Sequence, residues 1–150
     1  MNSMDLELIL NGGCIDMKDI EIVPFPPSGY HPLVDFESWR VAVLRPCEDL
    51  LPENLNHLQK HLYTDEVFVL LSGKCALYTA GCDEIPGEIM KTEMRLHEVY
   101  NVKKGVWHTL TLCEDAEVLI IENQDTGDEN SPKYPLSKDM HNRILELEKE

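Results

Sequence analysis

The chain has 150 residues, of which 43% are hydrophobic, which is enough for one domain around a single core. Its 28 acidic and 13 basic residues give a formal net charge of −15. Such an acidic surface repels phosphate backbones and anionic lipid. We therefore expect no nucleic-acid partner and no membrane partner. No apolar run approaches the roughly 20 residues of a membrane span, and acids stand where a signal peptide has bases. We therefore expect a cytoplasmic location.

The N-terminal segment, residues 1–35, is predicted to be irregular, because Asn11-Gly12-Gly13 and the proline-rich stretch 24–29 interrupt it. One or two short strands are expected near Asp19–Val23. The alternation of Glu37–Leu44 predicts a longer strand.

Residues 56–122 have the pattern of a β-domain, with short apolar stretches separated by turns. Ser72-Gly73 is expected to form a tight turn that pairs the strand before it with the strand after it. Regular short strands at this spacing indicate an all-β sandwich or barrel. The strands are expected at Asn56–Leu62, Glu66–Leu71, Lys74–Thr79, Glu98–Val102, Trp107–Leu112 and Glu117–Glu122.

Residues 123–150 are predicted to be an acidic connector followed by a short C-terminal helix. Residues 123–130 have no apolar periodicity, whereas Ser137 is a candidate helix N-cap before apolar residues at helical spacing. We expect this helix to dock on the barrel, so that residues 1–150 form a single domain.

The strand Glu66–Leu71 is apolar on both faces. One face is expected to line the barrel, and the face with Val67, Val69 and Leu71 also needs a cover. A second sheet, the N-terminal segment or another subunit would provide it. We expect a homodimer.

Five cysteines, Cys14, Cys47, Cys75, Cys82 and Cys113, are scattered without a CxxC pair. This number and spacing support neither a disulfide framework nor a thiolate zinc site, and they predict reduced, mostly buried thiols.

Histidines and a glutamate are the candidate functional residues. In an extended strand His57, Gln59 and His61 project to one side. Glu66 opens the next strand, and His108 opens a later one. Two imidazoles and one carboxylate on neighbouring strands would form a facial triad suited to Fe(II) and tolerant of Mn, Ni or Zn. On spacing alone, ordinary pocket or surface histidines are the competing interpretation.

The spacing of these residues resembles the two motifs of the cupin superfamily. The first motif, G-x5-H-x-H-x3,4-E-x6-G, is matched at His61, Glu66 and Gly73, with Gln59 at the first histidine and Glu53 at the leading glycine. In the second, G-x5-P-x-G-x2-H-x3-N, Gly105 and His108 match. His97, Lys103 and Leu112 stand at the remaining motif positions. The resemblance covers residues 56–122 and implies a double-stranded β-helix, or jelly-roll barrel, with the short helix added.

The resemblance also implies a divalent metal, Fe, Mn, Ni or Zn, on His61, Glu66 and His108. Gln59 maps to the fourth ligand, and His57 is a potential substitute for it. Such a protein would act on a small carboxylate, keto acid or sugar as a lyase, isomerase or dioxygenase, with Glu66 as ligand and proton acceptor. Ureidoglycolate lyase is one cupin enzyme of this size. The alternative is a metal-free cupin that binds a small molecule without catalysis.

Strand parity predicts the other residues that line the pocket. Inward positions are expected at Phe68, Leu70, Ala76, Tyr78, Leu110 and Leu112, although these residues would equally fill a barrel core. Trp107 has the opposite parity and is expected outside the pocket. Arg40, Arg45 and Tyr100 are either contacts for an anionic substrate or surface residues.

Overall fold

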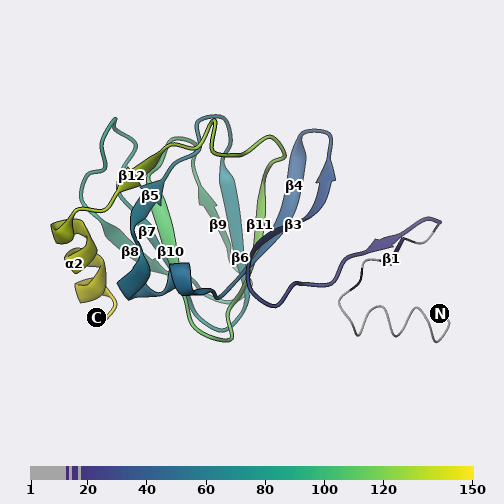
Figure 1. The fold of residues 1–150 in the computed structure, drawn as a ribbon, viewed down its shortest axis with the longest axis horizontal. Coiled ribbons are helices and arrows are strands. Elements are labelled where there is room, and N and C mark those ends of the chain that lie inside the picture. The colour runs from purple at the N-terminus through teal and green to yellow at the C-terminus, as the bar shows by residue number, and fades with distance from the viewer. Residues whose placement is uncertain (1–12, 14, 17) are drawn as a thin grey trace.

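The computed structural model describes residues 13, 15–16 and 18–150. Two five-stranded antiparallel sheets form the body, and β1 (Ile15–Asp16) pairs with β2 (Glu21–Ile22) in a separate N-terminal arm (Figure 1). The β5 sheet has the order β12 (Lys133–Pro135), β5 (His57–Gln59), β10 (His108–Leu112), β7 (Cys75–Thr79) and β8 (Met90–Glu93). The β6 sheet has the order β3 (Gly29–Phe36), β4 (Trp39–Arg45), β11 (Glu117–Asn123), β6 (Glu66–Ser72) and β9 (Val99–Val102). The all-β jelly roll is therefore confirmed.

Between β6 and β11 the chain crosses repeatedly from one sheet to the other. β6 pairs with β11 and β9, whereas β7 pairs with β10 and β8. The predicted pairing across Ser72-Gly73 is wrong, because this turn carries the chain to the opposite sheet. Gly73 adopts φ +70°, and a Cβ there would lie 2.6 Å from the backbone nitrogen of Ala116. Glycine is therefore required at this crossing.

A hydrophobic core fills the space between the two sheets. It contains Phe68 and Leu70 from β6, Leu110 and Leu112 from β10, and Ile120 from β11, each at most 6% exposed. These positions alternate along their strands, as the period of two requires.

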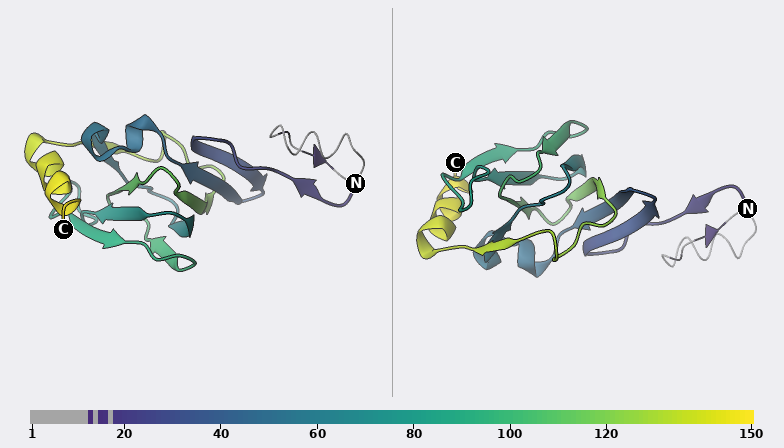
Figure 2. Two further views of the ribbon diagram at one scale, coloured as in Figure 1. Left: turned by 90° about the horizontal axis from the view of Figure 1, so that it is seen from below. Right: turned by 90° about the horizontal axis from the view of Figure 1, so that it is seen from above.

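A second apolar cluster covers the other face of the β5 sheet. Two short 3-10 helices, η1 (Glu48–Leu50) and η2 (Pro52–Asn54), precede β5, and α2 (Lys138–Leu147) packs on this face (Figures 1 and 2). Ile144 and Leu147 of α2 are buried. The Ser137 side chain accepts a hydrogen bond from the Met140 amide, which confirms the predicted N-cap.

Tyr78 and Ala76 belong to this second cluster, so their predicted placement in the pocket is wrong. The Tyr78 hydroxyl donates a hydrogen bond to Glu148 beyond the end of α2. The parity failed because β7 follows a crossing between sheets, and Cys75 and Leu77 face the core instead. Trp107 lies in the second cluster, outside the pocket, as predicted.

Three strands were not predicted, namely β3, β8 and β12. β3 lies in the segment 1–35 that was expected to be irregular, and it contains Pro32. The strand tolerates this proline because it is an edge strand whose register shifts between Pro32 and Val34. β3 and β4 are joined by Glu37-Ser38, with Glu37 at φ +48°. This residue pair does not have the usual composition of a hairpin turn.

The four described cysteines are free. Cys75 is buried, which raises the pKa of its thiol to about 12, but Cys82 is exposed and Cys47 and Cys113 are half-buried. The expectation of mostly buried thiols is therefore wrong for these residues, and Cys14 lies outside the described residues. In the part of the chain that the structure describes, no helix is long and apolar enough to cross a membrane.

Candidate metal centre and its cavity

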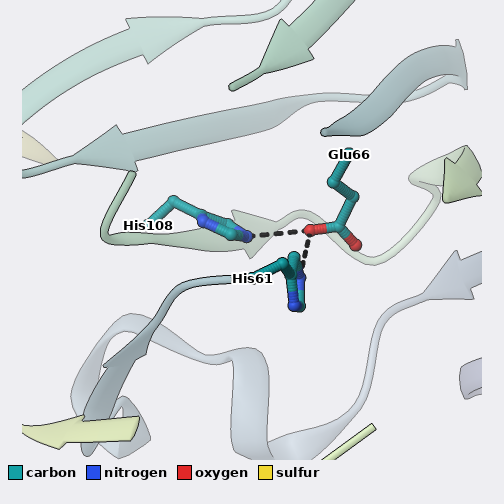
Figure 3. Close-up of side chains that lie close together, drawn as sticks. All are labelled: His61, Glu66 and His108. Carbon is teal, nitrogen blue, oxygen red and sulfur yellow. Dashed lines mark hydrogen bonds and ion pairs between the residues drawn. The ribbon is translucent and has the colours of Figure 1, made fainter. Parts of the chain in front are cut away.

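Three buried side chains meet at one end of the barrel (Figure 3). His61 follows β5, Glu66 is the first residue of β6, and His108 is the first residue of β10. β5 and β10 are neighbours in the β5 sheet, whereas Glu66 reaches the group from the β6 sheet. The Gly105 amide donates to the His61 carbonyl at 2.8 Å, which ties the turn before β10 to the segment after β5.

Both histidines contact the same carboxylate oxygen. The Nε2 atoms of His61 and His108 each lie 2.8 Å from Glu66 Oε2, and the three ligand atoms lie within 4.8 Å of one another. His61, Glu66 and His108 are 6%, 4% and 1% exposed, so solvent hardly screens their interaction. The competing interpretation as surface histidines is therefore wrong, and ordinary pocket histidines remain the alternative to metal ligands.

The outer nitrogens of the two imidazoles are also fixed. His108 Nδ1 lies 2.9 Å from the carbonyl oxygen of Val106, which only accepts, so Nδ1 carries the proton. Because Nδ1 is occupied in this way, Nε2 is the His108 nitrogen that faces Glu66. His61 Nδ1 lies 2.7 Å from the Ser131 hydroxyl. Hydrogen bonds behind the ring are typical of metal-binding histidines, because they fix the orientation of the coordinating nitrogen.

This donor set fits a divalent transition metal. Two imidazole nitrogens and a carboxylate oxygen are ligands that Fe, Mn, Ni and Zn accept. The three ligand atoms lie within 4.8 Å of one another, which is close enough for one ion to contact all of them.

The interactions within the group favour a negatively charged Glu66 beside a positively charged His61. Burial by itself raises the pKa of Glu66, but the hydrogen bonds from His108 and His61 outweigh burial and lower this pKa. Burial likewise lowers the pKa of His61, while the hydrogen bond and the negative charge of Glu66 outweigh it and raise this pKa. Glu66 is therefore ionised and attracts a cation to this position.

A cavity of about 690 Å³ opens beside the group. His57, Gln59 and His61 all line it, together with Glu66, Phe68 and Leu110. Gln59 is the cross-strand partner of His108. His57 contacts the Asn56 side chain, and its pKa is lowered chiefly by burial.

Sequence reasoning missed a second polar group in the cavity wall. Glu122 is 6% exposed and accepts a hydrogen bond from the Tyr30 hydroxyl, and Arg40 Nη1 lies 3.9 Å from it. Burial, followed by repulsion from Glu66, raises the pKa of Glu122. The sequence could have indicated Glu122, because it follows Val118 and Ile120 at every second position and so faces inward with them. Ser131 gave no signal, since it lies in a segment without periodicity.

The residues expected to contact an anionic substrate are engaged elsewhere. Arg40 pairs with Asp35 at 2.8 Å, and Arg45, which does not line the cavity, pairs with Glu117 at 3.3 Å. Tyr100 lines a separate space of about 400 Å³. Lys133 lines the 690 Å³ cavity, and its ammonium group pairs with Asp128 at 3.1 Å. The acidic residues that line it are Asp49, Glu66, Glu122 and Asp128.

No protein-family model and no curated protein matches the sequence. Solved structures do match the fold. Hydroquinone 1,2-dioxygenase from Sphingomonas sp. TTNP3, with 4-hydroxybenzoate bound, has a TM-score of 0.53 at 8% identity over 68% of this chain and 69% of its own. Streptomyces PAC13, solved with uridine, has a TM-score of 0.51 at 10% identity over 75% and 83%. A cupin-2 domain protein from Shewanella frigidimarina has a TM-score of 0.46 at 20% identity over 67% and 85%.

The chain therefore shares the fold of the hydroquinone dioxygenase and PAC13 structures, a jelly roll of two antiparallel sheets, which is the architecture that the motif resemblance implied. The likeness to these structures concerns the fold alone.

Proposed function

We propose that this chain is a cupin that binds a divalent metal through His61, Glu66 and His108 and acts on a small polar molecule in the adjoining cavity. The observation that carries the proposal is the contact of two buried imidazole nitrogens with one buried carboxylate oxygen, each at 2.8 Å. Gln59 is the candidate fourth ligand, since it lines the cavity and pairs with His108 across the strands.

Among the expected substrate classes, the wall of the cavity favours a neutral sugar over a carboxylate or keto acid. Four acids line the space, its lysine is paired with one of them, and both candidate arginines are engaged. An added carboxylate would face like charges there. Sugar hydroxyls, by contrast, would donate hydrogen bonds to Glu122 and accept one from Gln59.

The chemistry we propose is a lyase or isomerase step at a sugar carbonyl. When bound, the metal would supply Lewis-acid polarisation of that carbonyl. Both hydrogen bonds of Glu66 use Oε2, so Oε1 is the oxygen that we assign as proton acceptor. The core side chains Phe68 and Leu110 exclude water from the same wall.

Metal content of the untagged protein tests the proposal. We expect about one ion per chain in the wild type, strong loss in His61→Ala and His108→Ala, and retention in His31→Ala, whose histidine is exposed on β3. Equal and negligible metal in all four proteins would contradict the metal site. That result would favour the alternative of a metal-free binding cupin, which Gln59 at the position of a motif histidine supports.

Titration calorimetry then tests the substrate class with a matched pair, xylose and xylonate, on the metal-loaded protein. Xylose is expected to bind more tightly, and Glu122→Gln should weaken xylose binding without loss of metal. Tighter binding of xylonate, or no binding of xylose, would contradict a sugar substrate.

A further inference from the structure

An irregular segment beside the candidate metal centre connects the two sheets. We call this segment, residues 124–132, the strap. It leads from β11 of the β6 sheet to β12 of the β5 sheet (Figure 1). Its Ser131 is only 5% exposed. The strap contributes four residues to the wall of the 690 Å³ cavity, namely Thr126, Gly127, Asp128 and Ser131.

The strap is fastened along residues 60–64, the segment that holds His61 and leads to Glu66. Four hydrogen bonds of 3.0–3.2 Å join this segment to the strap and to the last residue of β11. They run from the Lys60 amide to the Pro132 carbonyl, from the Leu62 amide to the Asn130 carbonyl, from Asn123 Nδ2 to the Tyr63 carbonyl, and from the Asn123 amide to Thr64 Oγ1. The backbone on both sides of His61 is therefore held by the strap.

Within the strap, the side-chain amide of Asn130 has a defined orientation. One end lies 2.9 Å from the carbonyl oxygen of Asp125, which only accepts, so this end is the Nδ2 donor. The other end lies 3.0 Å from the Gly127 amide nitrogen, which only donates, so this end is the Oδ1 acceptor. Asparagine commonly stabilises irregular backbone in this way. The Oδ1 atom has a second lone pair for one more donor.

The orientation of Asn130 determines the direction of the hydrogen bond between Ser131 and His61. The Ser131 hydroxyl lies 3.3 Å from Asn130 Oδ1 and 2.7 Å from His61 Nδ1. Because Oδ1 only accepts, the single hydrogen of the hydroxyl is donated to Asn130. The hydroxyl oxygen is then the acceptor for His61, so Nδ1 of His61 carries a proton. This leaves Nε2 as the His61 nitrogen for a cation.

We propose that Asn130 is a positioning residue of the metal centre, which acts through the Ser131 hydroxyl to keep a proton on Nδ1 of His61. This inference rests on the proposed metal site, where Nε2 of His61 is the coordinating atom. His108 has the Val106 carbonyl as its acceptor, and a carbonyl cannot reverse its role. A hydroxyl can. Without Asn130, the Ser131 hydrogen can turn toward Nδ1, which places the ring proton on Nε2 and blocks coordination.

Competition for Zn²⁺ between the full chain and a chromophoric chelator measures the effect on the metal Kd. We expect Ser131→Ala to raise the Kd by about 10- to 100-fold and Asn130→Ala to raise it by about tenfold. Asn54→Ala is the matched control, because the Asn54 amide also donates to a backbone carbonyl, that of Glu48 at 2.9 Å, but lies in η2 outside the strap. It should leave the Kd unchanged.

The double variant separates an action through Ser131 from a general loosening of the strap. If Asn130 acts only through the hydroxyl, adding Asn130→Ala to Ser131→Ala leaves the Kd at the value of Ser131→Ala. Independent effects would instead multiply. Multiplied effects, or an unchanged Kd in Asn130→Ala, would overturn the proposal. Circular dichroism verifies that each variant folds. Asn130→Asp keeps an acceptor oxygen for the hydroxyl, so its Kd should stay below that of Asn130→Ala.

Nuclear magnetic resonance of the ¹⁵N-labelled, metal-free protein tests the hydrogen bonds without a metal. We expect a protected Nδ1 proton signal of His61, assigned by its absence in His61→Ala, and its broadening or loss in Asn130→Ala. A wild type that binds Zn²⁺ without this signal would overturn the role of Asn130 and leave the metal site. A wild type that shows the signal but binds no Zn²⁺ would overturn the metal site and leave the hydrogen-bond assignment.

Discussion

At the scale of single residues, Glu122 is the most unusual group outside the candidate metal centre. It is a buried acid in a cavity wall, and its pKa is raised, chiefly by burial. Folding therefore favours the protonated carboxyl. The stability that Glu122 contributes by taking up a proton is fully present below its pKa in the unfolded chain. It decreases as the pH rises above that value, and it is lost once the pH exceeds the higher pKa of the folded state.

Glu122→Gln should therefore stabilise the protein at neutral pH, by on the order of 1 kcal/mol. The amide oxygen can still accept the hydrogen bond from Tyr30. The advantage over the wild type should shrink toward pH 4, where the wild-type carboxyl is protonated. Urea unfolding of both proteins at about pH 4 and about pH 7.5 measures the difference. An advantage that is larger at the acidic pH would contradict the raised pKa.

The residues of the candidate metal centre were predictable because motif spacing records which strands meet. His61, Glu66 and His108 could be identified together, whereas Ser131 could not. Its hydroxyl comes from a segment without secondary-structure pattern, and only the folded chain brings it to His61. Local sequence gives no information about such a contact.

At the scale of elements, strand positions were more predictable than strand pairing. The period of two located β6, β9, β10 and β11, and the N-cap and apolar spacing located α2. Pairing failed at Ser72-Gly73, because a short glycine turn is compatible both with a hairpin and with a crossing to another sheet. Because of this error, Tyr78 was predicted to face the pocket, whereas it lies on the other face of the β5 sheet.

The crossing at Gly73 can be tested by adding a methyl group. Gly73→Ala should lower the free energy of unfolding by more than about 2 kcal/mol, because the new Cβ would lie 2.6 Å from Ala116 and φ is +70°. Gly81→Ala has φ +73° but open space, so it measures the dihedral penalty alone. Gly127→Ala has neither constraint. Comparable unfolding energies for Gly73→Ala and Gly81→Ala would exclude the close approach as the cause.

At the scale of the whole molecule, charge repulsion opposes the compact state. The net charge of −15 is distributed over a small fold, and few basic residues compensate it. Raising the ionic strength from about 0.01 M to about 0.1 M shortens the screening length from about 30 Å to about 10 Å. We expect the thermal midpoint to rise over this range, equally in NaCl and KCl, as followed by circular dichroism. A falling midpoint would mean that ion pairs such as Arg40–Asp35 outweigh the repulsion.

The hydrogen bond between His61 and Ser131 joins residues 70 positions apart. During synthesis, His61 and Glu66 emerge well before His108, and Ser131 follows only after β11 has been made. A nascent chain that ends between Glu66 and His108 therefore lacks both the second imidazole and the Ser131 hydroxyl that orients the first. In the proposed metal site, capture of a cation by all three ligands would therefore have to follow synthesis of the strands up to β10, and orientation of His61 by Ser131 would follow synthesis of β11.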